Sequence, residues 1–294
     1  MKKLRKLFYF KLKSFKNKNM FEDNNLWFLI FCVLPAIIYS LLIYKKAPKG
    51  VVEKKTMWSY IAIGLLSIQI LTIIHFLFPH IHTYIEFAPI LYDFGNGILG
   101  FVDEPTTFAI AVFAFFQVAF FEEISKWFAF RVGNAVRGDT RAGIDTPFAV
   151  MFYSVMIAVG FAAYENIHYV GRALWGDLEG VDPNQMPMIR SINSVVVHML
   201  SGLFMGFFIA IGRRCKNIFK HAGYTILGLL VATLFHGVYD FNLMSGTVES
   251  DFIEIIGIHF HIVNNVMIIG ALITAWFMSN KLLKISYNNQ GLLR

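Results

Sequence analysis

An apolar run over residues 107–130 carries two adjacent glutamates and a lysine, and this combination constrains the chain more than any other feature. The run is long enough for a helix to cross the hydrocarbon core of a bilayer, which takes about 20 residues. Glu122, Glu123 and Lys126 lie within it. One charged side chain at the centre of such a helix costs about 2.5–3.5 kcal/mol or more. Three of them together indicate a buried polar site inside a membrane protein.

The composition agrees with a membrane protein. Of the 294 residues, 56% are hydrophobic and 15% are charged, whereas soluble domains average about 25% charged residues. This disfavours a soluble helical protein. The net charge of +7 lies mostly between apolar runs, as loop charge does in membrane proteins, so it does not indicate a nucleic-acid partner. Cys32 and Cys215 lie in an apolar run and a basic loop, positions that give no reason to expect a disulfide.

Seven apolar segments predict an all-α, polytopic transmembrane helix bundle. The predicted spans cover residues 26–44, 57–78, 107–131, 147–170, 192–212, 222–243 and 255–279. The number is about seven, because the mixed segment 79–106 leaves an eighth span open. The chain shows no obvious soluble domain, long linker or internal repeat.

The chain divides into a basic amphipathic arm at 1–24, a membrane core at 25–284 and a tail at 285–294. Residues 1–20 hold eight lysines and arginines interleaved with Leu and Phe, a pattern typical of a segment on a lipid surface. From the second span on, basic and acidic connections alternate, which predicts a cytoplasmic C-terminus. Seven spans then place the arm outside, so the side on which the arm lies stays open.

In the third span, Glu122 and Lys126 are four residues apart and share a helix face, so the lysine can partly neutralise that carboxylate. Glu123 is rotated by about 100° and can point elsewhere. In the fourth span, Glu165 follows an aromatic residue by four positions, and Asn166 can hydrogen-bond a neighbouring helix. The alternatives are a structural ion pair for Glu122 and a water-exposed mouth for Glu165.

The fifth and sixth spans each carry a histidine. His198 has Gly202 four residues on, and small residues at that spacing let helices approach closely. His236 and Asp240 are also four apart, so the aspartate can accept a ring N–H and fix the tautomer. Alone, either histidine could be an ordinary buried hydrogen-bonding group. The remaining span-end histidines are interpreted as interfacial or structural: His80, His82, His168, His259 and His261.

Four helices can bring these groups around one polar pocket. Its predicted members are Glu122, Glu123, Glu165, His198, His236 and Asp240, with Lys126 at the edge. A carboxylate there can take a proton from water, with or without a metal, and a histidine can donate to an oxyanion. Neither Ser194 nor Ser201 has a local triad context, and no cysteine is close in sequence. One observation disagrees, since Glu123 and Glu165 differ in predicted depth by about 15 Å.

The cofactor stays open between none and zinc. Carboxylates and imidazoles suit zinc, and the candidate ligands are Glu123, Glu165, His198, His236 and Asp240.

Besides hydrolysis by an activated water, the same polar cluster fits two other functions. A proton- or cation-binding transporter would use the same groups, although paired broken helices and an internal repeat are not evident. A non-catalytic membrane scaffold with a degenerate site is the third hypothesis.

Four patterns carry a family resemblance: Glu122-Glu123-x-x-Lys126, Phe161-x-x-x-Glu165-Asn166, His198-x-x-x-Gly202 and His236-x-x-x-Asp240. In this order, over about residues 25–280, they resemble the motifs of the PrsW family of polytopic intramembrane proteases. That family is usually classed as glutamic-type, is sometimes proposed to be metal-dependent, and looks distantly related to CAAX- and bacteriocin-processing membrane proteases.

The resemblance implies catalytic carboxylates at Glu122 and Glu123. It implies that Glu165 and His198 help to bind water or a metal, and that His236 and Asp240 stabilise the oxyanion or complete a metal site. The implied protein resides in a bacterial plasma membrane and cuts a membrane-anchored protein, for some relatives an anti-sigma factor. The basic arm at 1–24 is not part of the family pattern.

Overall fold

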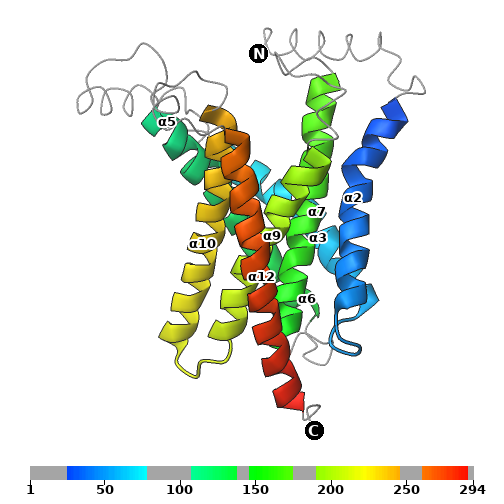
Figure 1. The fold of residues 1–294 in the computed structure, drawn as a ribbon, viewed down its shortest axis with the longest axis vertical. Coiled ribbons are helices and arrows are strands. Elements are labelled where there is room, and N and C mark those ends of the chain that lie inside the picture. Colours follow the sequence, from blue (N-terminus) through cyan, green and yellow to red (C-terminus); the bar gives the residue numbers. More distant parts are fainter. Residues whose placement is uncertain (1–24, 78–106, 138–145, 175–189, 246–259, 291–294) are drawn as a thin grey trace.

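The computed structural model describes residues 25–77, 107–137, 146–174, 190–245 and 260–290. Within these ranges nearly all of the chain is helical and no strand occurs, which confirms the predicted all-α class for this part of the protein. The long helices form a bundle (Figure 1). The arm at 1–24, the open span within 79–106, and the histidines His80, His82 and His259 lie outside the described residues.

Each predicted span coincides with a helix over its described residues. The first two are α2 (Asn25–Lys46), which contains Pro35, and α3 (Lys54–Leu77). The third is built from three consecutive pieces: α5 (Thr107–Val112), the π-helix η2 (Phe113–Phe120) and α6 (Phe121–Arg137). The others are α7 (Pro147–Leu174), the π-helical turn η3 (Arg190–Ser194) with α9 (Val195–Gly212), α10 (Ile218–Ser245) and α12 (Phe260–Gln290).

Four of the described helices are long and apolar enough to cross a membrane. They are Pro147–Arg172, Val195–Gly212, Ile218–Met244 and Asn264–Ser286. The predicted count of about seven spans is not confirmed and stays a prediction. The third predicted span is less apolar than these four. Its last helix, α6, carries five charged residues: Glu122, Glu123, Lys126, Arg131 and Arg137.

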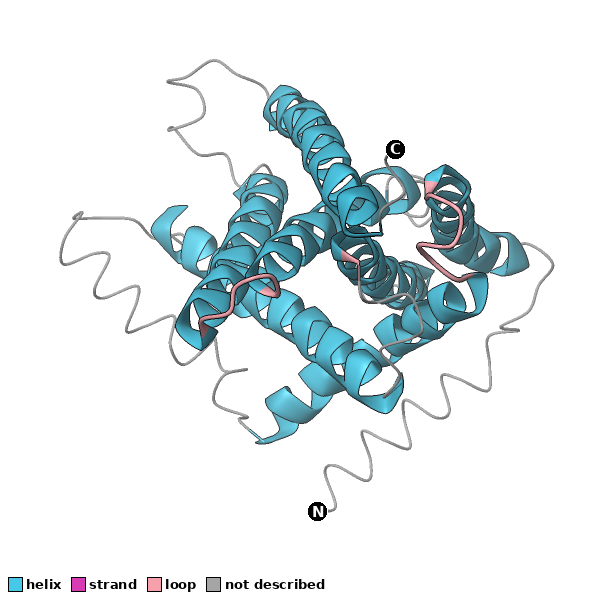
Figure 2. Ribbon diagram, turned by 90° about the horizontal axis from the view of Figure 1, so that it is seen from below, coloured by secondary structure: helices cyan, strands magenta, loops and turns pink. Residues whose placement is uncertain are grey.

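α7 is the enclosed helix of the bundle. Its apolar segment is 94% buried by the rest of the protein, whereas the corresponding segments of α10 and α12 are 17% buried. α3, α9 and α2 pack against α7, and α10 packs against α9 and η2. Viewed along the bundle, the described part of the chain consists of helices joined by short loops (Figure 2). The outward faces of α10 and α12 are apolar, as expected of helices that contact lipid.

Glycines allow the helices next to α7 to approach it closely. A Cβ atom at Gly160 would collide with the backbone of α3, and one at Gly64 would collide with the backbone of α7. Gly202 and Gly206 of α9 lie against α7 in the same way, as their spacing predicts. The residues met by Gly202 lie later in α7 than those met by Gly206, so α7 and α9 run antiparallel.

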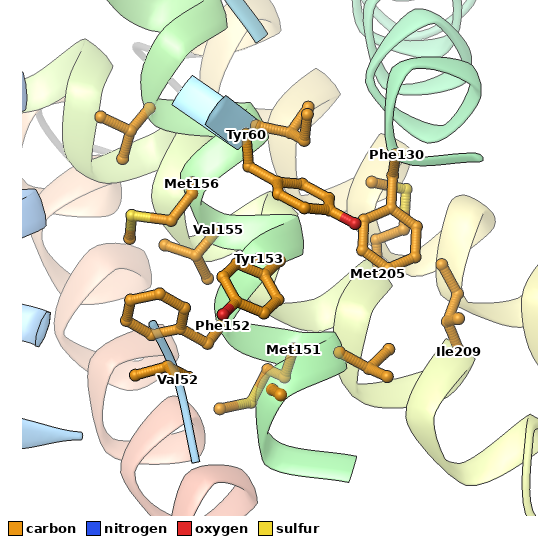
Figure 3. Packing of buried hydrophobic residues seen from close by; sticks show 14 of the residues in the cluster. Val52, Tyr60, Phe130, Met151, Phe152, Tyr153, Val155, Met156, Met205 and Ile209 are labelled. Atoms are coloured by element: carbon orange, nitrogen blue, oxygen red, sulfur yellow. The ribbon is translucent and has the colours of Figure 1, made fainter. Parts of the chain in front are cut away.

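An apolar core packs between α3, α6, α7 and α9 (Figure 3). Tyr60 of α3 stacks on Tyr153 of α7, with ring centroids 4.7 Å apart, and Phe130 of α6 packs beside them. Met205 and Ile209 of α9 close the other side. These residues come early in α7 and late in α9, so the opposite half of the same helices is left for the polar groups.

Candidate active site

α6, α7, α9 and α10 bring the predicted site residues into one buried cluster. Its members are Glu122, Glu123 and Lys126 from α6, Glu165 and Asn166 from α7, His198 from α9, and His236 and Asp240 from α10. Hydrogen bonds link Glu123 to Glu165 through Lys126 and His198. The expected difference in depth between Glu123 and Glu165 therefore does not exclude them from one site, because Lys126 and His198 lie between the two carboxylates and together contact both.

Glu123 is the most connected acceptor of the cluster, and its side chain is fully buried. A single carboxylate oxygen, Oε1, accepts hydrogen bonds from Lys126 Nζ at 2.7 Å, His236 Nδ1 at 2.9 Å and Ser201 Oγ at 3.0 Å. These donors come from α6, α10 and α9. Glu123 does not point away from Lys126, as its 100° rotation from Glu122 allowed, because an i,i+3 spacing also places it on the lysine face. Its contacts hold it as a fixed, ionised acceptor.

Lys126 lies inside the cluster with no exposed side-chain surface, so the prediction that it sits at the edge is wrong. A buried ammonium must find acceptors on several sides. Lys126 Nζ lies 2.7 Å from Glu123, 2.8 Å from His198 Nδ1, and 3.8 Å from Glu122 Oε2. It also lies 4.4 Å from the centre of the Phe161 ring, a cation–π distance. The predicted pairing with Glu122 exists, but Glu123 is the closer partner.

Both ring nitrogens of His198 are engaged by protein groups. Nε2 lies 2.7 Å from Glu165 Oε2, and Nδ1 lies 2.8 Å from Lys126 Nζ. Since a carboxylate only accepts, Nε2 carries the proton and Nδ1 accepts from the ammonium. The Glu165 side chain is only 11% exposed, so this carboxylate faces the cluster rather than a water-filled mouth.

His236 differs from His198 because both of its nitrogens face carboxylates and neither contacts the lysine. Nδ1 donates to Glu123, so this glutamate fixes the tautomer, and not Asp240 as the i,i+4 spacing predicted. Nε2 then presents its lone pair 3.3 Å from Asp240 Oδ2 and 3.8 Å from Glu122 Oε2. The two imidazole rings meet edge to face, with centroids 4.7 Å apart.

Three buried carboxylate oxygens have no hydrogen-bond partner among the described residues: Glu122 Oε2, Glu123 Oε2 and Asp240 Oδ2. Two of these, from Glu122 and Asp240, lie beside the free His236 Nε2. Unpaired buried acceptors are costly, and a divalent cation would satisfy such oxygen and nitrogen ligands together. The chemistry of this donor set therefore fits a metal.

The charge balance supports the same fit. Four carboxylates, from Glu122, Glu123, Glu165 and Asp240, meet the two cations Lys126 and Arg190 in the described cluster. With neutral histidines, the excess of two negative charges equals the charge of one divalent ion. Ligand atoms of Glu122, His198 and His236 lie within 4.8 Å of one another. Because both His198 nitrogens are already used, His236 is the more available of the two imidazoles.

Sequence reasoning weighed Ser201 only as a nucleophile and missed its hydrogen bond to Glu123, and it missed Arg190 as a member of the cluster. Ser201 lies one turn after His198 and donates to Glu123, so the i,i+3 spacing on α9 was the available signal. Arg190 Nη2 lies 2.9 Å from Glu165 Oε2. Burial lowers the pKa of its guanidinium, but Glu165 and the other acidic groups nearby together outweigh burial and raise the pKa, so the arginine stays charged. The available signal was an arginine directly ahead of an apolar span.

The fold and the site together define a helical membrane protein with a buried carboxylate–imidazole–lysine cluster. The chain belongs to the PrsW family, since a family model described as PrsW family intramembrane metalloprotease matches residues 53–273. This confirms the resemblance carried by the four motifs.

Curated relatives agree. Protease PrsW of Oceanobacillus iheyensis is 30% identical over 135 residues, which are 46% of this chain and 56% of that protein. Protease PrsW of Bacillus subtilis is 29% identical over 131 residues, 44% of this chain and 53% of the relative. Protease PrsW of Clostridioides difficile is 31% identical over 94 residues, 32% of this chain and 37% of the relative. The chain thus spans about half the length of the curated relatives it matches. No solved structure matches the chain.

Proposed function

We propose that the protein is an intramembrane protease that hydrolyses a peptide bond of a membrane-anchored protein by means of an activated water. The observation that carries the proposal is Glu122 Oε2, which has no hydrogen-bond partner among the described residues and lies 3.8 Å from His236 Nε2, in a cluster whose other groups are largely hydrogen-bonded. A poised base needs an open acceptor near the reacting atoms, and Glu122 supplies one. Family membership and the printed names of the relatives support the same function.

In this proposal Glu122 takes a proton from the attacking water and delivers it to the leaving amine. Glu123 keeps its charge and holds His236 with Nε2 toward Glu122 and Asp240. The Lys126 ammonium offsets negative charge that develops on the substrate carbonyl oxygen, an effect that is strongest in a site that excludes water. Glu165 and His198 fix Lys126 from the opposite side.

Glu122, His236 and Asp240 would hold a zinc ion or similar metal, in which case Glu122 acts as a ligand and not as the free base. His198, whose ligand atom lies within 4.8 Å of those of Glu122 and His236, could join only by releasing Lys126. When bound, such an ion supplies Lewis-acid polarisation and a water that loses its proton near neutral pH. Of the sequence-predicted ligands, Glu123 and Glu165 are less suited, because an oxygen of each is occupied by cationic donors. Glu122 was not among the predicted ligands.

We further propose that the C-terminus faces the cytoplasm of a bacterial plasma membrane. The C-terminal ends of α2 and α12 lie at the same end of the bundle (Figure 1). They carry Lys45, Lys46, Lys281 and Lys284, and lysine-rich ends remain on the cytoplasmic side. The proposed substrate is a membrane-anchored protein, anti-sigma-factor-like by the resemblance.

The test is cleavage of a single-span reporter peptide by the full chain purified in detergent. Glu123→Gln and His236→Ala are compared with His221→Ala, a control on the same helix as His236 but outside the cluster. We expect the wild type and H221A to cut the reporter and both cluster variants to lose at least about 100-fold in rate. Equal cleavage by all four proteins would contradict the proposal. Ion flux into liposomes without any cleavage would favour a transporter instead.

A further inference from the structure

Arg190 has no role in the proposed hydrolysis, yet its guanidinium is bound to the site. It begins η3, the π-helical turn directly ahead of α9, and its side chain is only 14% exposed. Nη2 lies 2.9 Å from Glu165 Oε2, and Nε donates to Asn166 Oδ1 at 3.0 Å. The guanidinium lies 4.1 Å from the centre of the Tyr169 ring. Three residues of one α7 face therefore fix one arginine.

These contacts use features that only arginine has. Its planar fork donates to adjacent acceptors at once and stacks on an aromatic face, whereas lysine offers a single point charge. A further hydrogen bond from Nη2 reaches Ser194 Oγ at 3.2 Å, within η3 itself. The start of α9 is thereby held to the end of α7, and α9 is the helix that carries His198.

The same Glu165 oxygen receives both Arg190 and His198. Oε2 accepts from Nη2 at 2.9 Å and from His198 Nε2 at 2.7 Å. Since Nε2 carries the proton in this contact, Nδ1 is left to accept from Lys126, which donates to Glu123 in turn. An unbroken line of contacts runs from the guanidinium to the centre of the cluster.

On the basis of the proposed function, we infer that Arg190 is a positioning residue: it fixes the Glu165 carboxylate so that His198 is held by Nε2 and turns Nδ1 toward Lys126. A residue that only fastened η3 to α7 would affect stability and leave the His198 ring unchanged. A positioning residue changes the hydrogen bonding of His198 and the rate of the chemical step. Outer partners of this kind are typically worth about 10–100-fold in activity.

The experiment compares Arg190→Met and Arg190→Lys with Arg172→Met in the full chain in detergent. Arg172 lies in the last turn of α7 and pairs with no acid among the described residues, so R172M is the matched control. Two readouts are used: kcat and KM on the single-span reporter, and nitrogen NMR of histidine-labelled protein with the His198 signals assigned from a His198→Gln variant.

We expect R190M to lower kcat by about 10–100-fold with KM within about twofold, and to shift the His198 ring signals. R190K should keep a positive charge next to Glu165 but lose the contacts to Asn166 and Tyr169, so we expect its kcat to lie between those of R190M and the wild type. R172M should match the wild type. Unchanged His198 signals in R190M, or equal losses in R190M and R172M, would overturn the inference. If R190M does not fold, Arg190→Gln replaces it and is judged by the same two readouts.

The NMR readout separates this inference from the proposed function. If the wild type cuts no peptide but R190M still shifts the His198 signals, the proposed protease fails while the positioning contact stands. If the wild type cuts the reporter and R190M neither slows kcat nor shifts those signals, the positioning role fails while the protease stands.

Discussion

The two adjacent glutamates occupy opposite electrostatic environments although they are neighbours in the chain. Glu123 has three donors on one oxygen and no exposed surface. Glu122 has one carboxylate oxygen without a hydrogen-bond partner among the described residues and keeps Lys126 and His236 at 3.8 Å. We infer a division of labour in which Glu123 organises the cluster and Glu122 reacts.

Stability should distinguish the two glutamates. Glu123→Gln removes the charge that compensates the buried Lys126, and breaking a buried pair in this way costs about 3–5 kcal/mol. Glu122→Gln should cost less than about 1 kcal/mol, because Glu123 still compensates the lysine. The measurement is thermal unfolding in detergent, with Glu53→Gln as a control at an exposed carboxylate. Equal destabilisation by E122Q and E123Q would contradict the division of labour.

Replacement of Ser201 tests whether its hydroxyl attacks the substrate or only donates a hydrogen bond to Glu123. Its Oγ donates to Glu123 at 3.0 Å, one of three donors on that oxygen. Ser201→Ala should therefore cost about 1 kcal/mol of stability and leave the cleavage rate within about tenfold of the wild type. Loss of all cleavage in a folded S201A protein would point to a serine nucleophile and against direct attack by water.

At the scale of elements, close helix crossings decide where the polar groups meet. α3 and α9 approach α7 at glycines, and the crossings at Gly64 and Gly160 admit no side chain. The π-helix η2 widens the turns directly ahead of α6 and packs against α10. π-helical turns often occur next to functional sites, and here one precedes the two glutamates while another, η3, carries Arg190.

The α3–α7 crossing predicts a sharp contrast between two glycines. Gly160→Ala introduces a Cβ into the backbone of α3, and the helices must move apart, so we expect a loss of about 1–3 kcal/mol. Gly270→Ala in α12 meets nothing within 4 Å and should stabilise its helix by up to about 1 kcal/mol. Unfolding midpoints that shift alike for G160A and G270A would show that the crossing is not close.

The positions of the helices and the members of the polar cluster could largely be predicted from the sequence. Apolar length and period placed a helix at every predicted span, and motif spacing identified the cluster members, because both depend on local chain geometry. The partner of Glu123, the buried position of Lys126 and the contact of Arg190 could not be predicted. These depend on helix rotation and on π-helical turns, which a hydrophobic pattern does not specify.

At the scale of the whole molecule, the protein buries an excess of negative charge in a bundle of apolar helices. The four carboxylates of the cluster exceed Lys126 and Arg190 by two charges, and two of the unpaired oxygens, from Glu122 and Asp240, lie beside His236 Nε2. Burial of such an excess is unfavourable without a counter-ion or bound protons. The fold is therefore expected to be more stable with a divalent cation.

Metal removal tests this expectation directly. Protein purified without chelator should contain about one zinc per chain by elemental analysis, and chelator should lower the unfolding midpoint, because an ion that binds only the folded state stabilises it. The double variant His236→Ala with Asp240→Asn should lose the metal, while His221→Ala keeps it. A metal-free wild type with full cleavage activity would instead assign water activation to the carboxylates alone.

The most direct test of the central claim is the rate at which E122Q cuts a single-span reporter relative to the wild type. E122Q keeps Glu123, Lys126 and the hydrogen-bonded frame, so its fold is expected to be retained while the free carboxylate oxygen is lost. The account predicts a fall of about 100–10,000-fold in kcat with unfolding unchanged. A folded E122Q protein that cuts the reporter within about twofold of the wild-type rate would contradict it.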